Sequence, residues 1–99
     1  GTTAGGLHLA ALGGVWQALA YGFLGLRPHR GGVLDVDPAL PQAWRSLSLR
    51  LCFQGARLRL RATHRELEVS CDRVVRVRSG LGTVQTCEPP GRTFPLGEE

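Results

Sequence analysis

Residues 46–63 read SLSLRLCFQGARLRLRAT, and this stretch decides the fold. From Ser46 to Gln54, leucine and phenylalanine alternate with serine, arginine, cysteine and glutamine. Arginine and apolar residues alternate again from Arg57 to Ala62. Because successive side chains of a strand point to opposite faces, each segment predicts a strand with one apolar and one polar face.

A tight turn is predicted between these two strands. Gly55-Ala56 suits a two-residue type II′ turn, which has glycine at its first central position. With this turn, Phe53 is expected opposite Leu58 and Leu51 opposite Leu60, so that one face of the hairpin is apolar throughout.

Further short strands, with turns between them, are expected on both sides of the hairpin. They are predicted at residues 33–36, 66–71, 74–78 and 83–87. Short antiparallel strands at this spacing are typical of a β-sandwich. We expect the sandwich over residues 46–99, with an irregular tail from residue 89, and a linker containing the short strand over residues 28–45.

The first 26 residues contain no charged side chain. A run of this length is enough to cross a bilayer, but His8, Gln17 and several glycines interrupt it. Apolar residues recur every four positions along it, which favours a helix over about residues 6–24 that is buried among other helices. The chain is therefore expected to be α+β, with one N-terminal buried helix followed by a small antiparallel β-sandwich.

The composition excludes several kinds of site. All 12 basic residues are arginine, and methionine is absent even at position 1, so we expect a piece of a longer protein. Cys52, Cys71 and Cys87 are odd in number and lack the CxxC spacing, which argues against a disulfide framework or a structural zinc site. We expect free thiols, no metal, and a reducing, cytoplasmic location.

The N-terminal segment Thr2-Thr3-Ala4-Gly5-Gly6-Leu7-His8 is a candidate anion site. At the start of a helix, unpaired backbone N–H groups and the helix dipole attract anions. His8 would add a second donor there. The structural alternatives are that the threonines cap the helix and that His8 is a core residue hydrogen-bonded to the backbone.

The segment TTAGGLHLAALGGVW, residues 2–16, resembles the end of the catalytic barrel in family 65 glycoside hydrolases and phosphorylases. Those enzymes break α-linked glucosides such as trehalose, maltose and kojibiose. GVLDVDPALP, residues 32–41, resembles the linker from their (α/α)6 barrel to their C-terminal β-sandwich. The resemblance implies that residues 1–27 hold the last barrel helix and the phosphate-side loop, residues 28–45 the linker, and residues 46–99 the C-terminal β-sandwich domain.

The resemblance also implies a chemistry for the parent enzyme. Phosphate, or water in hydrolytic members, would attack the anomeric carbon with inversion. His8 would bind the phosphate, with Thr2, Thr3 and Gly6 in the same loop, and inorganic phosphate would be a co-substrate with no other cofactor. The general acid lies upstream, so this chain is expected to hold no catalytic residue and to be inactive alone. Gly5 stands where family members often carry an acidic residue, which leaves a hydrolytic or degenerate member as an alternative.

The expected partners are the remainder of the parent enzyme and its disaccharide, with no membrane and no nucleic acid; a homodimer is left open. The alternative function is an arginine-rich β-sheet module that binds nucleic acid or another acidic partner. Its basis is a set of arginines expected on one outer face, namely Arg50, Arg57, Arg59, Arg61, Arg76 and Arg78. No aromatic residue interleaves with them to stack on bases, which favours a solvated face or a contact with the rest of the enzyme.

Overall fold

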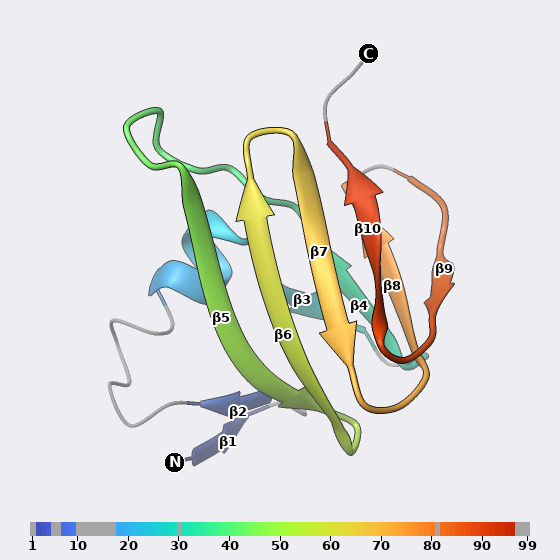
Figure 1. Ribbon diagram of the computed structural model, residues 1–99. Helices are drawn as coiled ribbons and strands as arrows, with labels where there is room; N and C mark the ends of the chain where they lie inside the picture. The colour runs from blue at the N-terminus through green and yellow to red at the C-terminus, as the bar shows by residue number, and fades with distance from the viewer. Residues whose placement is uncertain (1, 5–6, 10–17, 30, 81, 97–99) are drawn as a thin grey trace.

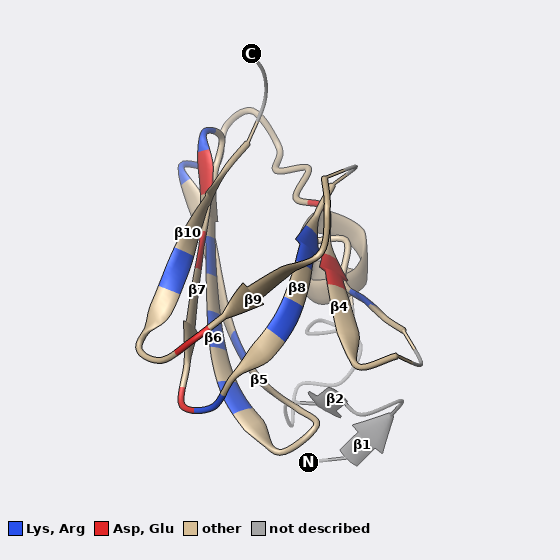
Figure 2. Ribbon diagram, turned by 90° about the vertical axis from the view of Figure 1, so that its right-hand side faces the viewer, with Lys and Arg blue, Asp and Glu red and all other residues tan. Residues whose placement is uncertain are grey.

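The computed structural model describes residues 2–4, 7–9, 18–29, 31–80 and 82–96. Most of these residues are in strands, which form a six-stranded and a four-stranded sheet. The two sheets lie face to face, as the views in Figure 1 and Figure 2 show. The predicted β-sandwich is therefore confirmed.

The six-stranded sheet is antiparallel throughout. Its long strands are, in spatial order, β5 (Ser46–Phe53), β6 (Ala56–Thr63), β7 (Glu66–Cys71) and β10 (Gly91–Pro95). A hairpin of β1 (Thr2–Ala4) and β2 (Leu7–Leu9) extends the sheet beyond β5. The hairpin joins where Leu7 pairs with Phe53.

The four-stranded sheet contains, in spatial order, β3 (Arg27–Pro28), β4 (Val33–Val36), β8 (Val75–Ser79) and β9 (Gln85–Cys87). β4 and β8 are parallel, whereas the other neighbours are antiparallel. The strand predicted at residues 33–36 is thus part of the sandwich, because its hydrogen-bonded partner is a strand forty residues further along the chain.

The hydrophobic core lies between the two sheets. In β6, Leu58, Leu60 and Ala62 are buried, while Arg57 and Arg59 between them are exposed. The other buried side chains are Ala20, Leu24, Leu26, Leu34, Val36, Leu51, Phe53, Ala56, Leu67, Val69, Cys71, Val75, Val77, Cys87 and Phe94. The strict alternation along the strands therefore places one face of each sheet in the core, as predicted.

The turn between β5 and β6 differs from the prediction. Phe53 pairs with Ala56 and Leu51 with Leu58, so the two-residue loop is Gln54-Gly55 and the predicted register is wrong by two residues. Both loop residues have positive φ, 51° for Gln54 and 83° for Gly55. This is the type I′ conformation, whose twist matches that of the flanking strands. The apolar face is preserved because a shift of two residues keeps each side chain on its own side.

The long N-terminal helix is not confirmed. Residues 7–9 are in a strand, and the helical part of the described chain is the single turn η1 (Ala18–Phe23). Residues 5–6 and 10–17 lie outside the described residues. A helix that is apolar on all sides is stable only when other helices cover it, whereas the described elements here are strands whose open edge can pair with residues 7–9. Among the described residues, no helix is long and apolar enough to span a membrane.

The structure also contains strands that were not expected from the sequence. β3 was not expected, and β10 lies where a tail was predicted. The segment carrying β10 approaches β7 so closely that a Cβ atom on Gly91 would overlap the carbonyl oxygen of Val69. Only glycine allows this approach, and the composition Pro-Pro-Gly conceals the strand because it is typical of turns.

Replacing Leu60 with alanine should lower the free energy of unfolding by ~2–5 kcal/mol, because truncation of a buried leucine leaves a cavity. Urea unfolding followed by circular dichroism measures this loss. Val74→Ala is the control, since Val74 is 58% exposed, and its free energy should change by less than about 0.5 kcal/mol. Equal losses for the two variants would contradict the position of Leu60 at the centre of the core.

Candidate functional site

The predicted phosphate-binding residues fall in the N-terminal hairpin. Thr3 pairs with His8, and Thr2 pairs with Leu9, across β1 and β2. Gly6 lies outside the described residues. The register therefore brings Thr3 and His8 to the same position of the hairpin, on strands rather than at a helix start. A role for these residues in phosphate binding stays a prediction.

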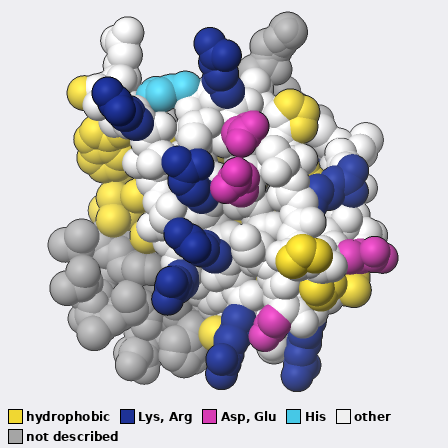
Figure 3. All heavy atoms as spheres, viewed as in Figure 1, with side chains coloured by type: hydrophobic (Ala, Val, Ile, Leu, Met, Phe, Trp, Pro, Cys, Tyr) yellow, Lys and Arg dark blue, Asp and Glu magenta, His cyan; other side chains and the backbone are white. Residues whose placement is uncertain are grey.

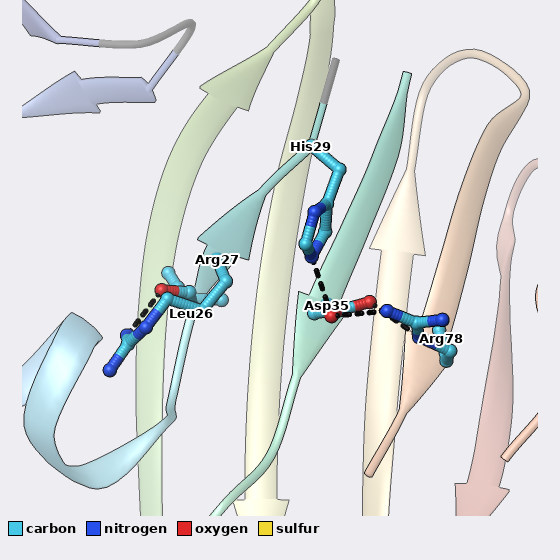
Figure 4. Close-up of polar contacts among 5 residues, drawn as sticks. All are labelled: Leu26, Arg27, His29, Asp35 and Arg78. Carbon is cyan, nitrogen blue, oxygen red and sulfur yellow. Dashed lines mark hydrogen bonds and ion pairs between the residues drawn. The ribbon is translucent and has the colours of Figure 1, made fainter. Parts of the chain in front are cut away.

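A charged cluster joins the two parallel strands of the smaller sheet (Figure 4). Asp35 of β4 accepts two hydrogen bonds from Arg78 of β8, at 2.8 Å from Nε to Oδ1 and 2.7 Å from Nη2 to Oδ2. His29, in the loop before β4, places its Nε2 2.7 Å from Oδ2 of the same carboxylate. The bidentate bond to Arg78 is the main reason why the pKa of Asp35 is lowered, and the hydrogen bond to His29 adds to it.

The cluster is a consequence of strand pairing. Asp35 and Arg78 are direct partners in the parallel register of β4 and β8. Arg78 was expected on an outer arginine face, and neither it nor His29 was expected to contact Asp35. No local pattern could have done so, because the three residues come together only when strands forty residues apart pair.

The arginines do not share one face as predicted. Arg50, Arg57, Arg59 and Arg61 lie on the outer face of the six-stranded sheet, whereas Arg76 and Arg78 are on β8 of the other sheet. Arg76 also differs because its guanidinium group donates to the carbonyl oxygen of Gly31. The prediction was wrong because β8 does not pair with the hairpin of the first sheet; it pairs with β4 and β9 in the second sheet. Figure 3 shows the row of basic side chains that remains on the first sheet, with acidic side chains beside its upper part and at its lower end.

Two of the three thiols meet inside the sandwich. Cys71 of β7 and Cys87 of β9 are buried, and their Sγ atoms are 3.7 Å apart. Burial, and secondly the neighbouring Cys71 thiol, raise the pKa of Cys87 to about 12. Cys52 is half-buried on the outer side of β5. The prediction of free, buried or half-buried thiols is confirmed.

Removing the Asp35 carboxylate should change how stability depends on pH. Because the pKa of Asp35 is lowered in the folded chain, its ionised form stabilises the fold above its unfolded pKa of about 3.9, and this contribution is lost as the pH falls through the folded pKa. The difference in unfolding free energy between wild type and Asp35→Asn should therefore be largest near neutral pH and shrink in acid. Urea unfolding at pH values from about 2 to about 7 measures this difference in free energy. These values lie on both sides of the pKa of aspartate in the unfolded chain.

Glu88→Gln is the control for this series, since Glu88 is exposed and forms no hydrogen bond or ion pair with the other described residues. Its stability should follow that of wild type at every pH. If the difference in unfolding free energy between wild type and Asp35→Asn stayed constant across the acid range, the charge of the carboxylate would not contribute to stability.

Alkylation should distinguish the thiol of Cys52 from that of Cys87. The thiolate is the reactive form, and the raised pKa of Cys87, to about 12, leaves almost none of it near neutral pH. We expect iodoacetamide to modify Cys52 in the folded chain, and Cys87 only after unfolding in urea. Mass spectrometry of the digested protein counts the modified sites. Rapid alkylation of Cys87 in the absence of urea would contradict its burial.

Comparison with known proteins identifies the family. The family described as glycosyl hydrolase family 65, C-terminal domain, matches residues 26–79. A kojibiose phosphorylase of Caldanaerobacter subterraneus is 38% identical over 69 residues, which is 70% of this chain and 9% of that protein. An uncharacterised glycosyl hydrolase of Mycobacterium tuberculosis is 45% identical over 94 residues, or 95% of this chain and 11% of that protein. The chain thus spans about a tenth of the length of these relatives.

A solved structure has the same fold. A candidate kojibiose phosphorylase from the human microbiome matches 85% of this chain and 12% of its own, with a TM-score of 0.74 and 15% sequence identity. At this identity the match supports the fold of the sandwich. Together with the family match over residues 26–79, these comparisons show that the chain belongs to glycosyl hydrolase family 65 and carries that family's C-terminal domain.

Proposed function

We propose that the chain works as the C-terminal part of an enzyme that cleaves an α-glucosidic disaccharide, with inversion, using phosphate or water. The observation that carries this proposal is the similarity to named phosphorylases. In addition to the kojibiose phosphorylase of Caldanaerobacter, an α,α-trehalose phosphorylase of Geobacillus stearothermophilus is 42% identical over 55 residues, or 56% of this chain and 7% of that protein. The nucleic-acid alternative is not favoured, because these relatives are enzymes and the arginines are divided between two sheets.

The sandwich is proposed to have a structural role in that enzyme. Inverting glycosidases need two carboxyl groups about 6.5–9.5 Å apart that flank the bond to be cleaved. Three acidic residues lie on the described strands. Asp35 is held by Arg78 and His29, Glu68 lies 3.9 Å from Arg61 on the outer face, and Glu66 lies on the same strand as Glu68. Two of the three carboxylates are thus engaged with neighbouring cations, which supports our view that the general acid comes from the barrel and that this chain is inactive alone.

The proposed roles of the three segments follow their order along the chain. Residues 1–27 would belong to the end of the barrel and supply its phosphate-side loop, and residues 46–99 would form the C-terminal sandwich. Within the intervening segment, β4 is paired with β8, so the linker and the sandwich act as one unit. A rigid connection of this kind would transmit the position of the sandwich to the barrel.

His8 is proposed to bind phosphate, with Thr2, Thr3 and Gly6 in the same loop. Its support is the resemblance of residues 2–16 to the family's barrel end and the pairing of Thr3 with His8. A neutral or protonated imidazole and backbone N–H groups are suitable donors to a phosphate oxygen. Gly5, which replaces an acidic residue common in the family, would weaken this site.

A chimera tests the proposed function. In the Caldanaerobacter kojibiose phosphorylase, the aligned C-terminal segment is replaced by this chain. We expect the chimera to retain phosphate-dependent cleavage of kojibiose, and the chain alone to cleave neither kojibiose nor trehalose. Release of glucose and of glucose 1-phosphate measures both. A folded chimera that neither phosphorolyses nor hydrolyses kojibiose would contradict the proposal, as would cleavage by the chain alone.

His8→Ala in the chimera tests the phosphate site. Loss of a hydrogen bond to a charged group costs about 1.5–3 kcal/mol, so kcat/KM for phosphate should fall ~10- to 100-fold while any hydrolysis without phosphate is unchanged. The control is His29→Ala, because His29 contacts Asp35 on the other sheet and should leave phosphate dependence unaffected. Unchanged kcat/KM for phosphate in His8→Ala would remove His8 from the mechanism.

A further inference from the structure

Three arginines are close together on the outer face of the six-stranded sheet. Arg50 of β5 pairs directly with Arg59 of β6, and Arg59 pairs with Ser70 of β7. Arg57 lies two residues before Arg59 in β6, opposite Cys52. In an antiparallel pair, directly opposite residues have Cβ atoms about 4.5–5.5 Å apart, and diagonal neighbours are within reach of long side chains.

This arrangement is electrostatically unfavourable by itself. Like charges directly opposite each other destabilise a sheet. Among the described residues, the side chains of Arg50, Arg57 and Arg59 form no hydrogen bond or ion pair, whereas Arg78 is bound by Asp35 and Arg92 donates to the carbonyl oxygen of Thr86. An anion seated between the three guanidinium groups would relieve the repulsion.

The same residues line a pocket. It has a volume of about 470 Å³, and its lining includes Arg50, Cys52, Arg57, Arg59, Ser70 and Asp72; leucine, cysteine and proline make up the rest of the lining. This volume falls within the range of about 300–1,000 Å³ that is typical of small-molecule sites. Cys52, opposite Arg57, and Ser70, opposite Arg59, have short side chains, which leaves room for the pocket beside the arginines.

The charges of the pocket define its ligand. Three arginines and one aspartate line it, which makes a formal charge of +3 − 1 = +2. Asp72 is already engaged, because its Oδ1 accepts a 2.7 Å hydrogen bond from the backbone N–H of Arg57. A phosphate monoester carries about −1.5 to −2 at pH 7, and guanidinium groups bind its oxygens in pairs.

We propose that this pocket binds the phosphate monoester of a small sugar. The guanidinium groups of Arg50 and Arg59 hold the phosphate, with the Ser70 hydroxyl as a further donor. The remaining volume takes the sugar, and the second carboxylate oxygen of Asp72 accepts a hydrogen bond from a sugar hydroxyl. A nucleic acid fits less well, because the lining holds no aromatic side chain on which a base could stack. Binding at this pocket is independent of the nucleophile that the parent enzyme uses.

Calorimetric titration of the 99-residue chain tests the proposal at constant ionic strength. The ligands are glucose 1-phosphate, glucose 6-phosphate, inorganic phosphate and glucose, and the variants are Arg50→Gln and Arg59→Gln. We expect both sugar phosphates to bind more tightly than inorganic phosphate, and glucose not to bind. Each variant should weaken sugar phosphate binding ~10-fold or more, because it removes a charge-assisted hydrogen bond.

Arg65→Gln is the matched control. Arg65 is an exposed arginine at the turn between β6 and β7, outside the pocket, so the variant makes the same change in net charge. It should leave the affinity within about 2-fold of wild type, since surface charges distant from a site have small effects. The proposal is overturned if Arg65→Gln weakens binding as much as Arg59→Gln, if inorganic phosphate binds as tightly as the monoesters, or if no monoester binds. Circular dichroism of each variant confirms that the sandwich is intact.

Discussion

The structure depends on the contact between the inner faces of the two sheets. Neither sheet can remain stable alone, because each buries its apolar side chains only against the other. Leu60 and Val69 of the larger sheet, and Val36 and Val77 of the smaller one, are almost fully buried in this contact. The arginines, the charged cluster and the thiol pair all take their positions from it.

The outer sides of the same strands are free to carry charge. Since side chains alternate along β6, burial of Leu58 and Leu60 forces Arg57 and Arg59 outward. The repulsion between Arg50 and Arg59 is tolerated because the core on the opposite side holds the register. The proposed anion site uses these outward side chains and requires no change in the fold.

The strands of the smaller sheet are held together in a different way. Its central strands are parallel, and their pairing is reinforced by the ion pair between Asp35 and Arg78. Parallel strands need a long connection, and here that connection includes the long hairpins of the larger sheet. The smaller sheet can therefore form only when the larger one does, which makes the sandwich one cooperative unit.

Much of this could be derived from the sequence alone. The strict alternation over residues 46–63 determined two strands and their buried faces, because period-two patterning depends only on neighbouring residues. Residues 2–16 and 32–41 carried the resemblance to family 65, and the odd number of cysteines without CxxC spacing carried the expectation of free thiols. Only the tertiary structure decided the pairing of β4 with β8, the meeting of Asp35 with Arg78, and the division of the arginines between two sheets. These three features depend on contacts between segments that are distant in the sequence. Which strands share a sheet decides those contacts, and the pattern of residues within a single strand does not reveal it.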